Sequence, residues 1–244
     1  MSAALLVLLA LAAWELYARG GAVDDLVLPA PTEVAAALVR DRALLWDNFL
    51  VTAGEVALGI LVALLAGFAL AVGLHFSRAA RRAVYPVLVA SQAVPIPVIA
   101  VLLVVWLGFG LAPKLAIIAL VSFFPVVVTT LDALRRVDPD LLKLLRTMDA
   151  SRWQAFRFAE LPAAAPAALS GARIGVAVAV IGAVFAEYSG SEAGLGHLIL
   201  QAIPQLETAR AYAAVVVLAA FAVALFFALA AAERWLDPRP GENR

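Results

Sequence analysis

The sequence predicts an all-α membrane protein with about six transmembrane helices. Of its 244 residues, 65% are hydrophobic and only 15% are charged, a composition too apolar for a soluble domain of this length. The apolar residues gather in long runs, and about 20 consecutive apolar residues span a bilayer as a helix. A net charge of zero without charged tails gives no indication of a nucleic-acid partner. With no cysteine and two histidines, no metal site is expected.

Residues 1–18 are predicted to form the first span. They end with Trp14 and Tyr17, aromatic residues that favour the membrane interface. A cleaved signal peptide is the alternative, but no basic residue precedes Arg19, so a retained span is favoured. The run is shorter than the roughly 20 residues a span needs, which suggests that a few residues are missing at its start.

An extracytoplasmic segment is predicted at 19–48, with a short amphipathic helix from Val34 to Trp46. Residues 49–233 then form the core, with five spans at 49–75, 84–106, 115–134, 171–187 and 212–232, before a cytoplasmic tail at 234–244. Small residues at every fourth position let neighbouring helices approach closely. Two spans carry such stripes: Gly59, Ala63, Gly67 and Ala71, and Gly171, Gly175, Ala179 and Ala183. Glu55 is expected to be an interfacial carboxylate rather than a cavity group.

The third span is interrupted near its middle by Ser91-Gln92 and by Pro95 and Pro97. Prolines free backbone carbonyls, and such a break is tolerated at membrane depth only where it is buried in protein or lines a cavity. Gln92, Pro95 and Pro97 are therefore pathway candidates, together with Glu187 at the end of the fifth span; a simple packing kink is the alternative.

The glycine run at 190–196 lacks a phosphate-loop pattern and is interpreted as a flexible turn.

The polar loop at 135–162 is predicted to form two short helices. Asp138 is an N-cap acceptor followed by proline at the first helical position. Leu141, Leu144, Leu145 and Met148 follow at i, i+3, i+4 and i+7, an apolar stripe that excludes Lys143 and Arg146.

A tight turn joins the two helices. Asp149 tolerates a left-handed backbone, and Ser151 with Gln154 has the form of a capping box. The second helix carries Trp153 and Phe156 on one side, and Leu161-Pro162 is expected to end it. Such a hairpin either lies on the membrane surface or docks a partner protein, and the pattern alone does not choose.

The distribution of positive charge predicts the orientation. With both termini cytoplasmic, 13 of the 18 lysine and arginine residues fall in inner segments and five in outer ones. The positive-inside rule therefore places the loop at 135–162 in the cytoplasm.

The loop resembles the cytoplasmic E-A-A loop of membrane subunits of ATP-binding-cassette (ABC) importers. The motif's glutamate falls on Lys143, its alanines on Leu144 and Leu145, its glycine on Asp149 and its final Leu-Pro on Leu161-Pro162. A longer ordered series resembles the nitrate/sulfonate/taurine branch of the binding-protein-dependent permeases. This series consists of Trp14-Glu15-Leu16, Leu28 to Val34, the broken third span, Trp106 to Gly110, Phe123-Phe124-Pro125, Val137-Asp138-Pro139, Ala150 to Trp153, Ala186 to Gly190 and Gly194-Leu195-Gly196.

The resemblance implies a type-1 ABC importer permease of the bacterial inner membrane, a multi-pass protein and not an enzyme. It implies a homodimer, a cytoplasmic ABC ATPase dimer and an extracytoplasmic solute-binding protein; ATP and Mg would bind the ATPase, and this chain would hold no cofactor. The solute would be small and polar, of the nitrate, sulfonate or taurine type or a pyrimidine precursor of thiamine, and Glu187 to Gln201 looks closest to the pyrimidine-precursor members. The ATPase-docking residues carried over by the resemblance and the helix pattern are Asp138, Leu141, Lys143, Leu145, Arg146, Met148, Asp149, Ser151, Arg152, Trp153, Leu161 and Pro162.

The alternative function is an ion-coupled carrier or a membrane-embedded enzyme that acts without an ATPase. Either would need a constellation of ionisable groups at membrane depth. Glu55, Glu187, His75 and Arg173 all lie near span ends and form no recognisable set, so an importer permease is the favoured function.

Overall fold

The computed structural model describes residues 3–21, 24 and 26–236, and the regular structure in these residues is helical. The helices are α1 (Ala3–Arg19), α2 (Pro31–Arg40), α3 (Arg42–Phe76), α4 (Arg78–Ser91), α5 (Ile96–Leu107), α6 (Leu111–Arg135), α7 (Pro139–Thr147), α8 (Arg152–Ala155), a π-helical turn η1 (Phe156–Glu160), α9 (Leu161–Gly190), α10 (Leu195–Ala202) and α11 (Thr208–Leu236). Most of the predicted tail at 234–244 lies outside the described residues.

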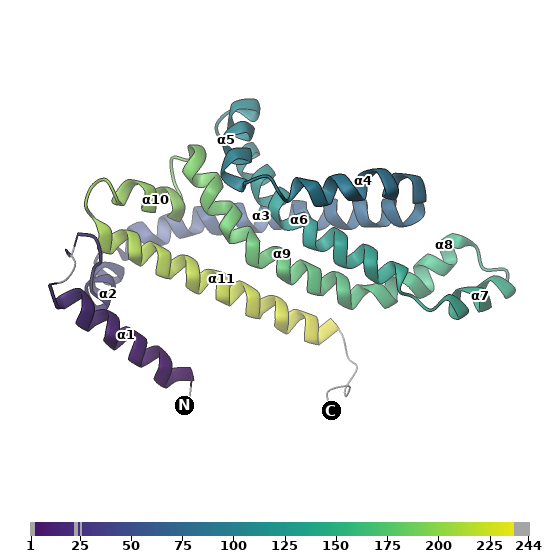
Figure 1. Cartoon of the computed structure of the whole chain (residues 1–244), viewed down its shortest axis with the longest axis horizontal. Coiled ribbons are helices and arrows are strands. Elements are labelled where there is room, and N and C mark those ends of the chain that lie inside the picture. Colours follow the sequence, from purple (N-terminus) through teal and green to yellow (C-terminus); the bar gives the residue numbers. More distant parts are fainter. Residues whose placement is uncertain (1–2, 22–23, 25, 237–244) are drawn as a thin grey trace.

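Four of the described helices are long and apolar enough to cross a membrane. They are α3, α6, α11 and one continuous helix, Arg152–Gly190, that joins α8, η1 and α9. Helices α7 and α8 lie at one end of the molecule, and α2 and α10 lie at the other (Figure 1). The long helices thus connect two ends built from shorter helices.

The centre of the bundle is the close packing of α6 against both α3 and α9. Glycine makes this possible. A Cβ added at Gly175 of α9 would lie 2.6 Å from the backbone oxygen of Ser122 in α6, and one added at Gly171 would lie 2.9 Å from that of Pro125. The two predicted stripes of small residues therefore face neighbouring helices, as expected for helices that associate in lipid.

The third predicted span, 84–106, is two helices. Its α4 and α5 meet at an angle of 106° across the break after Ser91, so α5 stands away from α4 (Figure 1). Pro95 has no N–H to continue a helix and instead precedes the first turn of α5. In addition, α4 begins at Arg78 because the hydroxyl of Ser77 accepts the backbone N–H of Ala80 at 3.2 Å.

Three other predicted helix boundaries are wrong. The amphipathic helix expected from Val34 to Trp46 ends at Arg40, and α3 begins at Arg42 rather than at residue 49. The helix expected to end at Leu161-Pro162 continues through both residues into α9. The wider π turn immediately before Pro162 explains this continuation, because the backbone N–H of Leu161 bonds the carbonyl of Phe156, five residues earlier, and the turn accommodates a ring that would clash in an ordinary α-helix.

Candidate coupling loop and pathway

The first helix of the loop, α7, is capped as the sequence predicts. Asp138 precedes it, and its carboxylate accepts the backbone N–H of Asp140 at 2.8 Å. Pro139 occupies the first helical position, where a missing N–H costs nothing. These two residues fix the start of the helix relative to the end of α6.

The turn between α7 and α8 also follows the prediction. Asp149 has a φ of 57°, in the left-handed region, and the next N–H, that of Ala150, bonds the carbonyl of Leu145 at 3.0 Å. Ser151 and Gln154 form the reciprocal capping box, with the Ser151 N–H donated to Gln154 Oε1 at 2.7 Å. The loop is therefore an ordered helix–turn–helix.

One face of the loop presents large apolar side chains to its surroundings. Leu144, Met148 and Trp153 are 57%, 71% and 58% exposed, and Leu141 is 41% exposed. Leu145, which belongs to the same predicted stripe, is half-buried. It therefore contributes less to the exposed face than the other three α7 residues of the stripe do. Exposed apolar groups gathered in this way mark an interaction surface.

The other predicted docking residues lie elsewhere on the same loop and at the start of α9. Lys143 pairs with Asp140 across the outside of α7 at 2.7 Å. Arg146 and Arg152 are exposed, whereas Leu161 is half-buried and Pro162 is exposed at the start of α9. The structure thus brings the predicted set together at one end of the bundle.

Aromatic side chains connect the loop to the end of α3. The ring of Phe76 lies 5.0 Å from that of Phe156 and 6.4 Å from that of Trp153, between centroids. Beside them, His75 Nε2 lies 2.7 Å from Glu160 Oε2. These contacts tie the loop to two long helices, α3 and the Arg152–Gly190 helix.

The pathway candidates separate into two locations. Gln92, Pro95 and Pro97 lie at the α4–α5 break, and their side chains are exposed. Glu187, in contrast, is fully buried and lies among helices α3, α9 and α10. In this conformation, Glu187 does not face an open pathway.

Glu187 instead holds the first turn of α10. Its carboxylate accepts the Gly196 N–H at 2.5 Å, the His197 N–H at 3.3 Å and the Thr52 hydroxyl at 2.6 Å. Gly194 and Gly196 are buried against it, so the interpretation of the glycine run as a flexible turn is wrong. A carboxylate at a helix N-terminus satisfies N–H groups that have no partner within the helix.

A second carboxylate lies in the same region. Glu55 of α3 is 5% exposed and pairs with Lys114 of α6 at 2.6 Å, and Lys114 also donates to the Ser191 hydroxyl at 2.5 Å. Glu55 is therefore a buried ion-pair partner, and its interpretation as an interfacial carboxylate is wrong. Glu55 and Glu187 belong to one polar cluster, which sequence reasoning missed.

A pattern in α3 does indicate this cluster. Asn48, Thr52 and Glu55 stand at i, i+4 and i+7, so they share one face of an otherwise apolar helix. Asn48 accepts the Gly194 N–H at 2.8 Å, and Thr52 accepts the Leu195 N–H at 2.9 Å. The partners come from α6, α9 and α10, and their proximity depends on how the helices pack.

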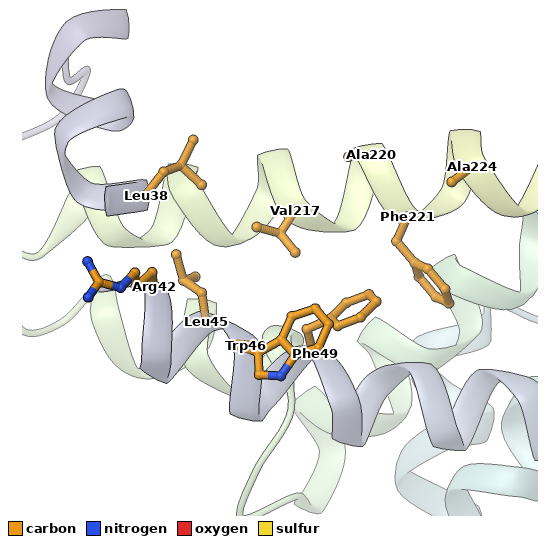
Figure 2. Close-up of a pocket in the computed structure, with 9 residues that line it drawn as sticks. All are labelled: Leu38, Arg42, Leu45, Trp46, Phe49, Val217, Ala220, Phe221 and Ala224. Atoms are coloured by element: carbon orange, nitrogen blue, oxygen red, sulfur yellow. The ribbon is translucent and has the colours of Figure 1, made fainter. Parts of the chain in front are cut away.

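An apolar pocket lies between the start of α3 and the middle of α11 (Figure 2). Its volume is about 400 Å³, and its lining includes Trp46, Phe49 and Phe221, with Arg42 as the one charged residue. Sites for polar solutes need several convergent polar groups, and this pocket does not provide them.

The fold and the loop together define a class, a multi-pass helical membrane protein with an ordered, exposed loop. The chain matches the model of the binding-protein-dependent transport system inner membrane component over residues 59–241, and it belongs to that family. It is accordingly a permease subunit of an ABC importer, and the alternative of an ion-coupled carrier or a membrane-embedded enzyme is not supported.

Several curated relatives agree with this assignment. A probable ABC transporter permease protein of Haemophilus influenzae is 38% identical over 216 residues, 88% of each chain. The formylaminopyrimidine transport permease protein ThiX of Halalkalibacterium halodurans is 30% identical over 235 residues, 96% of this chain and 94% of the relative. The riboflavin transport system permease protein RibX of Chloroflexus aurantiacus is 32% identical over 232 residues, 94% and 87% of the two chains. Taurine and aliphatic-sulfonate permease proteins are also relatives, which confirms the branch that the resemblance named.

The fold matches a solved ABC transporter. A chain of the inward-facing MetNI methionine ABC transporter superposes with a TM-score of 0.71 at 18% identity, covering 81% of this chain and 98% of that chain. The architecture is therefore that of a type-1 ABC importer permease, as the resemblance implied.

Proposed function

We propose that the α7–α8 loop docks a separate cytoplasmic ATPase dimer and transmits its closure to the membrane helices. The observation that carries this proposal is the exposed apolar face of Leu141, Leu144, Met148 and Trp153 on a loop that continues into a membrane helix without a break. An amphipathic helix with such a face is suited to a groove in a partner protein. ATP and Mg bind that ATPase, and the permease itself contributes no cofactor and no catalytic group.

In this mechanism, the continuous Arg152–Gly190 helix transmits movement from the loop to the membrane helices. A force on α8 passes through η1 and α9 to Glu187, which holds α10 at the far end of the molecule (Figure 1). The contacts of Phe76 with Phe156 and of His75 with Glu160 extend the same movement to α3. Closure of the nucleotide-bound ATPase thus moves both ends of the bundle at the same time. Alternating access requires such coupled movement, because the pathway must open on one side of the membrane while it closes on the other.

A second copy of the permease completes the pathway. The α4–α5 break exposes Gln92, Pro95 and Pro97 on a single chain, and irregular backbone at membrane depth is tolerated where protein covers it or where it lines an aqueous cavity. A homodimer places this break at or beside the subunit interface, and the solute passes along that interface. An extracytoplasmic binding protein delivers the solute to the opposite end from the loop.

The solute belongs to the range that the branch transports, and a pyrimidine precursor of thiamine is the first candidate because the formylaminopyrimidine permease aligns over 96% of this chain. Selectivity resides mainly in the separate binding protein. Binding calorimetry of the cognate binding protein against pyrimidines, flavins, taurine, alkanesulfonates and nitrate tests the assignment. Preferential binding of taurine, sulfonates, nitrate or flavins would contradict a pyrimidine solute.

The coupling role is tested with charged substitutions on the exposed face. Leu144→Glu and Met148→Glu place a carboxylate where the partner packs, but they alter side chains that the permease itself leaves exposed. We expect both variants to insert normally and to lose ATPase activity stimulated by the binding protein in proteoliposomes. Arg136→Gln is the matched control, since it changes the net charge by the same amount at an exposed residue that lies before α7 and outside the apolar face. Full stimulation in both face variants would contradict the proposal.

A further inference from the structure

A large basic cavity lies between the loop and the adjoining ends of α3, α4 and α6. Its volume is about 570 Å³, within the range of small-molecule sites. Six arginines contribute to its lining: Arg78, Arg81, Arg82, Arg135, Arg146 and Arg152. Neither the exposed apolar face of α7 nor the α4–α5 break accounts for this concentration of positive charge.

Among the described residues, the lining of the cavity does not balance its positive charge. Glu160 is the one carboxylate in the lining, and it already pairs with His75 at 2.7 Å. Arg152 lies over the ring of Phe76, 5.1 Å from its centroid, and donates to the backbone oxygen of His75 at 3.4 Å. In the described part of the chain, none of the other five arginines forms an ion pair or a side-chain hydrogen bond.

The start of α4 adds further uncompensated positive charge to the cavity. Arg78, Arg81 and Arg82 all fall within the first five residues of this helix, and its first turn contains no acidic residue. Cations are unfavourable at a helix N-terminus, where the helix dipole is positive and backbone N–H groups point outward. A bound anion would compensate both the dipole and the arginines.

The cavity is separate from the face proposed to dock the ATPase. Leu142 and Arg146 line the cavity and stand one turn apart on α7. Leu144 and Met148 also stand one turn apart, but each lies two residues from Arg146, which places them on the opposite side of the helix. A partner that packs on Leu144 and Met148 therefore leaves the cavity lining accessible from another direction.

We propose that this cavity binds a phosphate-bearing anion. The guanidinium group offers several donors in a planar fork that matches phosphate oxygens, and several such groups converge here. The cavity lies at the basic ends of two membrane helices, where the headgroup of an anionic phospholipid reaches it from the bilayer and a soluble phosphate compound reaches it from the cytoplasm. The bound anion would brace the loop against α4 and α6, because Arg146 belongs to the loop and Arg81 and Arg135 belong to those helices.

The test measures anion binding by the full-length permease without its ATPase, so its outcome is independent of the docking proposal. Purified protein in detergent is titrated with phosphatidylglycerol, phosphatidylcholine or inorganic phosphate, and binding is followed by native mass spectrometry and thermal unfolding. The cavity variant is Arg81→Gln/Arg82→Gln. The control is Arg136→Gln/Arg157→Gln, which removes the same charge from two exposed arginines outside the cavity.

We expect wild-type and control proteins to bind the anion, and we expect the cavity variant to bind it at least tenfold more weakly, since the loss of a single charge-assisted contact worth about 1.4 kcal/mol already weakens binding tenfold. Saturable binding of phosphatidylglycerol that millimolar phosphate does not displace identifies a lipid headgroup as the source. Binding of inorganic phosphate with displacement of the lipid identifies a soluble one.

Three results would overturn the proposal. The first is equal weakening in the cavity and control variants, which would mean general electrostatic attraction. The second is no binding of either anion by the wild-type protein. The third is unchanged anion binding in the cavity variant, which would mean that the anion binds outside the cavity. Arg135→Gln, at the end of α6, serves as a second cavity variant if the double variant does not fold.

Discussion

Lys114 of α6 and Glu55 of α3 form a buried ion pair, with 2.6 Å between Nζ and Oε1. Their side chains are 11% and 6% exposed, so neither charge is well solvated. Lys114 also donates to Ser191, beyond the end of α9. The pair therefore links three helices at the end of the bundle that contains α10.

Removing one partner of this pair is expected to be strongly destabilising. Lys114→Met leaves the Glu55 carboxylate buried without its counterion, which costs about 3–5 kcal/mol in comparable sites. Lys143→Met is the matched control, because Lys143 and Asp140 form a similarly short pair, 2.7 Å apart, but are 72% and 81% exposed, and exposed pairs contribute about 0–1 kcal/mol. Denaturant unfolding in detergent measures both, and equal losses would contradict a special role for the buried pair.

Gly194 is expected to tolerate no side chain. Its φ is 116°, and a Cβ there would overlap the Glu187 carboxylate. Gly194→Ala should therefore displace the carboxylate from the first turn of α10, with a loss of about 1–3 kcal/mol for the buried groups left without partners. The measurement is hydrogen exchange at the Gly196 and His197 amides, which should speed up. Gly73→Ala is the control, since Gly73 is helical with open space around its Cβ position, and alanine there should be neutral or stabilising.

The sequence predicts local features of this fold well. The caps at Asp138 and Ser151, the left-handed Asp149 and the small-residue stripes all depend on residues within a few positions of one another. The caps and the turn have local physical causes, because they supply partners for backbone groups nearby in the sequence, and each stripe is a pattern visible within a single helix. Such features are therefore predictable without knowledge of any tertiary contact.

Contacts between distant helices could not be predicted in this way. Glu55 and Lys114 are 59 positions apart, and Thr52 and Glu187 are 135 positions apart. Each residue alone is consistent with a solvated span end, and only the packing of α3, α6 and α9 brings them together. The same limit explains Pro162, where the π turn of η1 overrides the usual tendency of proline to end a helix.

Asp41 gives an expected pH dependence outside the membrane helices. The hydrogen bond from Arg40, with further help from Arg210, lowers the pKa of Asp41 from 3.8 to about 2. The folded pKa is lower than the unfolded one, so Asp41 stabilises the fold fully above pH 3.8, and this contribution declines as the pH falls toward 2. Asp41→Asn removes the ionisation. The difference in unfolding midpoint between the wild type and Asp41→Asn should be constant above about pH 5 and should shrink below about pH 4; a difference independent of pH would contradict the assignment.

Asp149 provides the sharpest test of the loop's turn. Its φ of 57° is a conformation that glycine adopts without cost and that a β-branched residue adopts poorly. Asp149→Gly should therefore keep or slightly raise stability, and Asp149→Val should lower it by about 1–2 kcal/mol. Both variants remove the same carboxylate, so a difference between them reports the backbone and not the charge.

The same two Asp149 variants also test whether the turn is needed for coupling to ATP hydrolysis. Because the turn sets the angle between α7 and the Arg152–Gly190 helix, Asp149→Val should reduce transport-coupled ATP hydrolysis in proteoliposomes, whereas Asp149→Gly should retain it. If both variants lost coupling equally, the carboxylate of Asp149 would contact the ATPase directly. If both retained it fully, the left-handed turn would not be needed to transmit movement to α9.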